Sequence, residues 1–160
     1  MSAHSTKASQ LFRSGYNCAQ SVVGAFADRL PVTYEVAMKL ASPFGGGIGR
    51  LRETCGAASG MLLVIGLTEG YFETEDINEK AALYQTVQSL MKEFQNRLGS
   101  YCCRELLGGN ISYSPIPTPR TEEFYRTRPC EIIIMAAAEL LDDYFSEKPE
   151  SMCASDSTKK

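Results

Sequence analysis

The chain has 160 residues, of which 44% are hydrophobic and 22% charged, and its formal net charge is −3. This composition is ordinary for a soluble globular protein, and the length favours one domain whose core needs no disulfide support. The mild acidity, the scattered basic residues and the absence of Trp argue against a nucleic-acid-binding protein. We expect one helical domain over residues 1–146 and a polar, disordered tail over 147–160 that contains Cys153.

The first three predicted helices are short. Apolar residues at helical spacing over 8–12 predict a first helix, which Gly15 can end. Asn17 is a typical N-cap for a second helix that begins at Cys18, and Thr33 can cap a third that ends near Ser42. The following segment, residues 43–52, is a glycine-rich turn.

A helix from Cys55 to about Leu67 is apolar on almost every side, which predicts a central buried element. Its longest apolar run, residues 61–67, is far shorter than the roughly 18 residues that a membrane span needs. Gly56 and Gly60 lie four residues apart on one face. Because glycine lacks a side chain, this face favours close approach of another backbone or of a ligand.

The second half of the chain is also helical. Apolar residues at steps of three and four predict a long amphipathic helix over about 75–98, which ends at Gly99. Three prolines make residues 111–120 an extended connection. Pro129 suits the first position of a last helix that contains Cys130. The sequence therefore predicts an all-α, single-domain bundle of about five main helices.

Four of the six cysteines lie at predicted helix starts: Cys18, Cys55, Cys103 and Cys130. The free N–H groups and partial positive charge of a helix N-terminus stabilise a thiolate, which is the reactive and metal-binding form. Helix starts from several elements can gather at one end of a bundle. We therefore expect these four side chains to form one site.

Three kinds of function fit such a site. A pair of thiols can cycle between dithiol and disulfide, which would make the chain a thiol-dependent oxidoreductase. The same four cysteines can instead be metal ligands for zinc or an iron–sulfur cluster. In the third case the cysteines are inert and buried, and the bundle is a scaffold or interaction protein. The N-terminus lacks a signal-peptide pattern, so we expect a cytoplasmic protein, where cysteines are more often redox groups or metal ligands than structural disulfides.

The glycine-rich turn does not match a phosphate-binding loop, because no strand precedes it and the motif spacing is absent. Its exposed N–H groups, together with Arg50 and Arg52, favour a nearby anion, either the Cys55 thiolate or a bound cluster. We expect Cys55 to have the lowest thiol pKa. The candidate cofactor-binding residues are Gly45, Gly46, Gly47, Gly49, Arg50, Gly56 and Gly60.

Other chemistry-bearing residues are weaker candidates. His4 is the only histidine and is expected in a mobile N-terminus, so no cysteine has a credible general base. The acidic pairs 122–123 and 142–143 are expected on solvated helix faces. Cys102 adjoins Cys103, and either neighbour could face the site.

The ordered motifs resemble a family of redox-type proteins, C_GCAxxG_C_C. Its signature is similar to residues 55–60, C-G-A-A-S-G, and the other characteristic cysteines match Cys18, Cys103 and Cys130. The resemblance covers roughly residues 5–146 and implies redox activity with an unknown redox partner. A related domain occurs in multihaem proteins with an iron–sulfur centre, which keeps cluster binding open. This chain lacks C-x-x-C-H, so no covalent haem is expected. Apolar helix faces could also support a homodimer.

Overall fold

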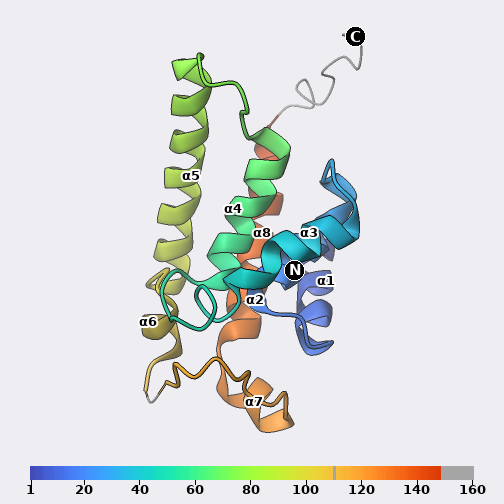
Figure 1. The fold of residues 1–160 in the computed structure, drawn as a ribbon, viewed down its shortest axis with the longest axis vertical. Coiled ribbons are helices and arrows are strands. Elements are labelled where there is room, and N and C mark those ends of the chain that lie inside the picture. Colours follow the sequence, from blue (N-terminus) through green and yellow to red (C-terminus); the bar gives the residue numbers. More distant parts are fainter. Residues whose placement is uncertain (110, 149–160) are drawn as a thin grey trace.

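The computed structural model describes residues 1–109 and 111–148, and these form an all-α fold without a strand, as predicted. Figure 1 shows the bundle, with α4 and α8 at its centre and α5 along one side. The α-helices are α1 (Ala3–Arg13), α2 (Cys18–Ala25), α3 (Tyr34–Ala41), α4 (Gly56–Glu69), α5 (Ile77–Leu98), α6 (Cys103–Leu107), α7 (Glu122–Thr127) and α8 (Cys130–Glu147). Two short 3₁₀ turns, η1 (Ala27–Arg29) and η2 (Ser42–Phe44), complete the described elements.

The helix boundaries follow the local signals in the sequence. The Asn17 side chain accepts a hydrogen bond from the Gln20 backbone N–H, and the Gln20 side chain accepts from the Asn17 N–H, forming a capping box. The Thr33 side chain accepts a hydrogen bond from the Val36 N–H and caps α3. Gly99 ends α5 in the left-handed conformation that glycine adopts at little cost. These three predicted boundaries are confirmed.

Helix α4 packs closely against α2, because two of its glycines have no side chain at the contact. A Cβ at Gly60 would lie 2.8 Å from the Ala19 carbonyl oxygen, and one at Gly56 would lie 3.1 Å from the Cys18 Cβ. Both distances are too short for an ordinary contact, so the predicted close approach is confirmed. It brings the start of α4 next to the start of α2.

Three of the sequence predictions are wrong, and they concern His4, Asp142 and Pro129. His4 does not lie in a mobile segment but in α1, where its ring stacks on Phe26 at 4.1 Å between centroids and its Nδ1 lies 2.6 Å from Asp142 Oδ1. Asp142 is accordingly not solvated, because its side chain is only 20% exposed. Pro129 is the N-cap of α8 rather than its first residue. Cys153 lies outside the described residues.

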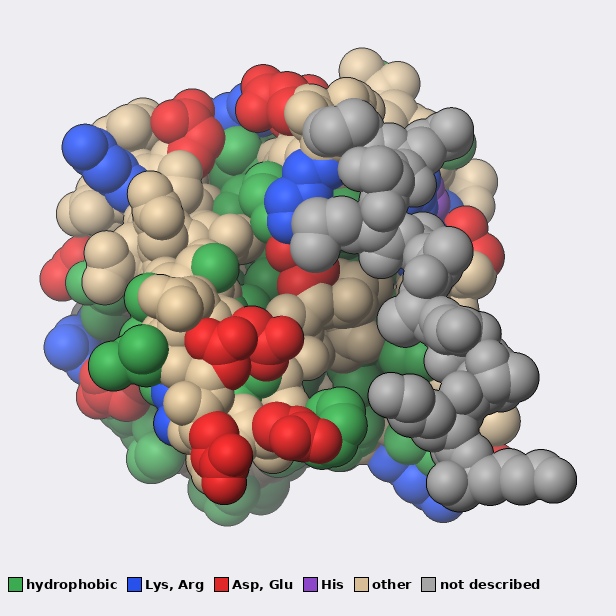
Figure 2. Space-filling model, turned by 90° about the horizontal axis from the view of Figure 1, so that it is seen from above, with side chains coloured by type: hydrophobic (Ala, Val, Ile, Leu, Met, Phe, Trp, Pro, Cys, Tyr) green, Lys and Arg blue, Asp and Glu red, His purple; other side chains and the backbone are tan. Residues whose placement is uncertain are grey.

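The two ends of the bundle differ in charge. Figure 2 looks onto the end where α4 leads into α5, and Asp and Glu side chains gather on it. A surface hollow there is lined by Glu73, Glu75, Asp76 and Glu79. The four cysteines of interest lie at the opposite ends of α4 and α8. Within the described part of the chain, no helix is both long and apolar enough to cross a membrane.

Candidate functional site

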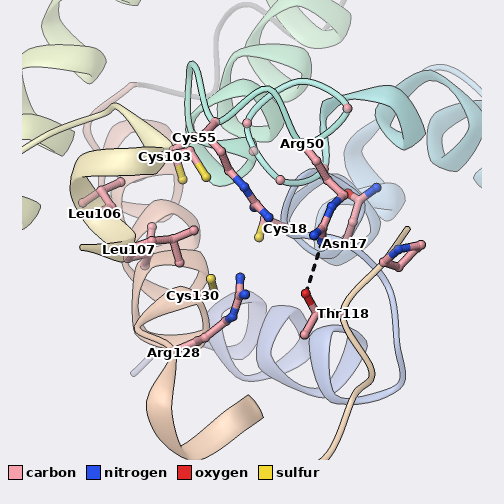
Figure 3. Close-up of a pocket in the computed structure, with 18 of the residues that line it drawn as sticks. Asn17, Cys18, Arg50, Cys55, Cys103, Leu106, Leu107, Thr118, Arg128 and Cys130 are labelled. Carbon is pink, nitrogen blue, oxygen red and sulfur yellow. Dashed lines mark hydrogen bonds between the residues drawn. The ribbon is translucent and has the colours of Figure 1, made fainter. Parts of the chain in front are cut away.

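Four cysteine side chains line one cavity of about 310 Å³ (Figure 3). Cys18, Cys103 and Cys130 are the first residues of α2, α6 and α8, and Cys55 is the N-cap of α4. The cysteines that the sequence places at separate helix starts are therefore brought together in space. All five cysteines within the described ranges are free thiols.

A short pairing of two loops sets Cys55 beside Cys103. Thr54 and Cys102 form an isolated antiparallel bridge. The Cys55 N–H donates to the Tyr101 carbonyl at 2.8 Å, and the Cys103 N–H donates to the Glu53 carbonyl at 2.7 Å. Cys103 lines the cavity, whereas the Cys102 sulfur lies 3.6 Å from the Arg52 carbonyl oxygen and does not. Of the two adjacent cysteines, Cys103 is thus the one that faces the site.

The glycine-rich turn forms a wall of the cavity in an unusual backbone conformation. Five consecutive residues, 46–50, have positive φ, and two of them, Ile48 and Arg50, are not glycine. Side chains disfavour this region, and such strain is concentrated at functional sites. At Gly47 (φ 71°) a Cβ would lie 2.6 Å from the Cys103 Cβ. The turn therefore needs glycine there to approach Cys103.

Arginines surround the sulfurs. Arg52 is only 2% exposed, and its Nε and Nη2 donate to the Ser112 carbonyl at 3.0 and 2.9 Å. Arg50 donates to the Ser114 carbonyl and to Thr118 Oγ1, the latter at 3.3 Å (Figure 3). The extended segment that follows α6 thus holds both arginines toward the cavity.

Two further arginines, Arg120 and Arg128, also line the cavity. The guanidinium carbon of Arg120 lies 4.5 Å from the centroid of the Phe12 ring, and that of Arg128 lies 4.9 Å from the Phe124 ring. Neither was among the site residues predicted from the sequence. Neither belongs to a recognisable motif, and the only available signal was their position on either side of α7.

Cys130 is the most acidic thiol for which a shift is resolved. The neighbouring Cys18 thiol favours a thiolate at Cys130, and the positive charges of Arg128, Arg120 and Arg52 add to this effect. Together they outweigh burial and lower the pKa of Cys130 to about 7. The interaction with Cys130 and burial have the reverse effect on Cys18, whose pKa is raised well above its ordinary value.

Cys55 behaves in the opposite way, and the prediction that it has the lowest thiol pKa is wrong. Burial raises the pKa of Cys55 to about 12, although the backbone N–H groups of Ala57 and Ala58 face its sulfur and act in the other direction. Burial also raises the pKa of Cys103, although the nearby Arg52 guanidinium acts in the other direction. A helix start alone does not make a thiolate when the sulfur is withdrawn from water.

The predicted cofactor-binding residues fall into two groups. Six line the cavity: Gly45, Gly46, Gly47, Gly49, Arg50 and Gly56. Gly60 does not, because it lies in the contact between α4 and α2. Across residues 1–109 and 111–148, no three Cys, His, Asp or Glu side chains converge closely enough to hold a metal ion.

Comparison with known proteins gives a family but no individual relative. Neither a curated protein nor a solved structure matches the chain. A family described as "Putative redox-active protein (C_GCAxxG_C_C)" matches residues 16–144, a range that includes all four cysteines of the cavity. Because this match covers most of the sequence, the chain belongs to the C_GCAxxG_C_C family.

Proposed function

We propose that this protein is a thiol–disulfide oxidoreductase in which Cys130 attacks and Cys18 resolves. The observation that carries the proposal is that Cys18 and Cys130 line one cavity with four arginines, where Cys18 is the largest influence that lowers the pKa of Cys130. At neutral pH about half of Cys130 is thiolate, since its pKa is about 7. Thiolate is the form that attacks a disulfide.

The exchange consists of two displacement steps. The Cys130 thiolate attacks one sulfur of a substrate disulfide, a mixed disulfide forms, and the other substrate sulfur leaves as a thiolate. Cys18 then loses its proton to solvent or to the departing thiolate and attacks the Cys130 sulfur, which releases the second substrate thiol. The substrate gains two electrons and the protein forms a Cys18–Cys130 disulfide. An external dithiol must reduce this disulfide to restore the starting state.

Cys55 and Cys103 form a second pair of thiols in the cavity that is less reactive than Cys18 and Cys130. Both are almost fully buried, and both have raised pKa values. We infer that they stay protonated while Cys18 and Cys130 react. A reducing compartment such as the cytoplasm, where dithiol reductants keep cysteines free, suits this cycle.

Disulfide mapping tests this function. The reduced protein is treated with one equivalent of hydroxyethyl disulfide, remaining thiols are alkylated in denaturant, and linked peptides are identified by mass spectrometry. We expect a Cys18–Cys130 disulfide as the main product, preceded by a mixed disulfide on Cys130. A main product that joins Cys55 to Cys103, or no oxidation of Cys130, would contradict the proposal.

A second function, ligation of zinc or an iron–sulfur cluster, is favoured by one observation: all four sulfurs line the same cavity together with arginines that could offset a negative cluster. As arranged, the described side chains do not form a ligand set for an ion. Anaerobic purification followed by iron, sulfide and zinc analysis separates the two functions. Stoichiometric metal that is lost in both Cys55→Ser and Cys130→Ser would favour ligation over thiol exchange.

A further inference from the structure

The cavity contains positive charge that no carboxylate of its lining balances. Its lining includes four arginines and no Asp or Glu. In the part of the chain that the structure describes, none of these four forms an ion pair, whereas four other arginines each pair with a carboxylate. The cavity arginines are Arg50, Arg52, Arg120 and Arg128. The paired arginines are Arg13, Arg97, Arg104 and Arg126.

The excess of positive charge in the cavity matters because part of it is buried. Arg52 is 2% exposed and always charged, yet its hydrogen bonds go to the neutral Ser112 carbonyl. Burial lowers the pKa of Arg50, and the positive charges of Arg52 and Arg128 lower it further. The three guanidinium groups therefore repel one another across the cavity. A buried charge without a counter-charge is costly, and an anion in the cavity would relieve that cost.

The backbone holds this arrangement in place. Arg50 and Arg52 have φ values of 70° and 63°, in the left-handed region that residues with side chains disfavour. This conformation lets both side chains reach across to the 112–118 segment, where they are fixed by hydrogen bonds. The acidic residues instead gather at the far end of the bundle (Figure 2). The resulting field attracts anions to the cysteine cavity.

We propose that the substrate of the cavity is a small disulfide that bears an anionic group such as a carboxylate, bound by Arg50 and Arg128 while its sulfurs face Cys130. This inference rests on the thiol–disulfide function proposed above and names its substrate class. A cavity of about 310 Å³ has the size of a site for one small molecule. The anionic group remains unchanged in the reaction, in which the substrate disulfide takes two electrons from Cys18 and Cys130.

Three aliphatic disulfides of similar size test the charge preference: dithiodipropionate (dianion), hydroxyethyl disulfide (neutral) and cystamine (dication). The rate at which each disulfide oxidises Cys130 is divided by the rate at which the same disulfide reacts with free mercaptoethanol. This ratio removes differences in the intrinsic reactivity of the disulfides. We expect the dianion to react fastest and the dication slowest. Added KCl should slow the dianion and leave the neutral disulfide unchanged, because salt screens the arginines.

Arg50→Gln provides the sharpest variant, because Arg50 is not among the groups that lower the pKa of Cys130. It should slow oxidation by the dianion about tenfold more than it slows oxidation by the neutral disulfide. Arg50→Lys should retain most of the wild-type rate, and Arg104→Gln, which changes an arginine already paired with Glu53, should have no effect. Equal normalised rates for all three disulfides in wild-type protein would overturn the charge preference and leave the thiol function standing. If none of the three oxidised Cys130, both proposals would fail.

Discussion

The two cysteine pairs of the cavity differ in reactivity although their members lie at similar helix starts. The contrast is clearest in the pKa values of Cys130 and Cys55. Cys130 and Cys55 both lie at the start of long helices. The pKa of Cys130 is lowered to about 7, whereas that of Cys55 is raised to about 12. A helix N-terminus supplies roughly 0.3–1 kcal/mol, which is less than one pKa unit. Burial can supply several units, so sulfur exposure and neighbouring donors decide which thiol reacts.

The largest expected effect is the difference in activity between variants of the two cysteine pairs. Cys130→Ser should lower the rate of disulfide reduction by about 1,000-fold or more, because a serine hydroxyl is not a nucleophile at neutral pH. Cys55→Ser should lower it only a few-fold, and Cys102→Ser, whose side chain lies outside the cavity, should leave it unchanged. The measurement is thiol release from hydroxyethyl disulfide under single-turnover conditions. A greater loss in Cys55→Ser than in Cys130→Ser would reverse the comparison.

A smaller effect is expected on the stability of the protein when the turn that packs against Cys103 is changed. Gly47→Ala should destabilise the protein by about 3 kcal/mol, because alanine is strained at positive φ and its Cβ would overlap Cys103. Gly49→Ala is a matched control with the same kind of φ, and the nearest atom to its Cβ, the Pro43 carbonyl oxygen, is 4.0 Å away. It should cost only about 1 kcal/mol. Urea unfolding of both variants measures the difference, and equal losses would show that Cys103 is not tightly packed against the turn.

The pH dependence of stability should have opposite signs for the two cysteines. The pKa of Cys130 is about 7 in the folded protein against an ordinary 9.0, so between these values the unfolded state binds more protons and stability rises with pH. The rise should be on the order of 2 kcal/mol and should vanish in Cys130→Ala. The pKa of Cys55 is raised to about 12, so its contribution falls as pH increases above 9. Urea unfolding from pH 6 to 10 measures both trends, and a flat profile that Cys130→Ala does not alter would contradict them.

The smallest predicted effect concerns the arginines that act on Cys130. Arg128→Gln should raise the pKa of Cys130 by about half a unit to one unit, because it removes one positive charge near the sulfur. Arg126→Gln removes an exposed charge from α7, two residues before Arg128, and should cause no shift. Thiolate absorbance against pH in a variant that retains only Cys18 and Cys130 would reveal the change. An equal pKa shift in both variants would indicate that the net charge of the region, and not the position of Arg128 next to the sulfur, lowers the pKa of Cys130.

The helix starts, and hence the four cysteines, could be predicted because their signals are local. Asn17, Thr33 and Gly99 set boundaries through bonds within a few residues of themselves. The glycines of α4 also predicted a close approach, since glycine is costly in a buried helix unless another backbone or a ligand lies against it. The predicted gathering of cysteines at one end followed from these local features.

The ranking of the cysteines could not be predicted, because it depends on contacts between distant segments. The pairing of residues 52–55 with 101–104 buries Cys55 and Cys103, and no sequence pattern indicates it. Arg128 lies near Cys130 in sequence, but Arg52 reaches the cavity only through a turn with three non-glycine residues at positive φ. His4 illustrates the same limit, since its partner Asp142 is far away in the chain.

The central claim is that Cys130 is the reactive thiol of the cavity, and its ionisation can be measured directly. Reduced native protein is labelled briefly with iodoacetamide from pH 5 to 10, and each cysteine is quantified by mass spectrometry. We predict that Cys130 is modified first, with a midpoint near its pKa of about 7, and that Cys55 stays unmodified up to pH 9. Modification of Cys55 before Cys130, or a Cys130 midpoint at the ordinary thiol value of about 9.0, would contradict the account.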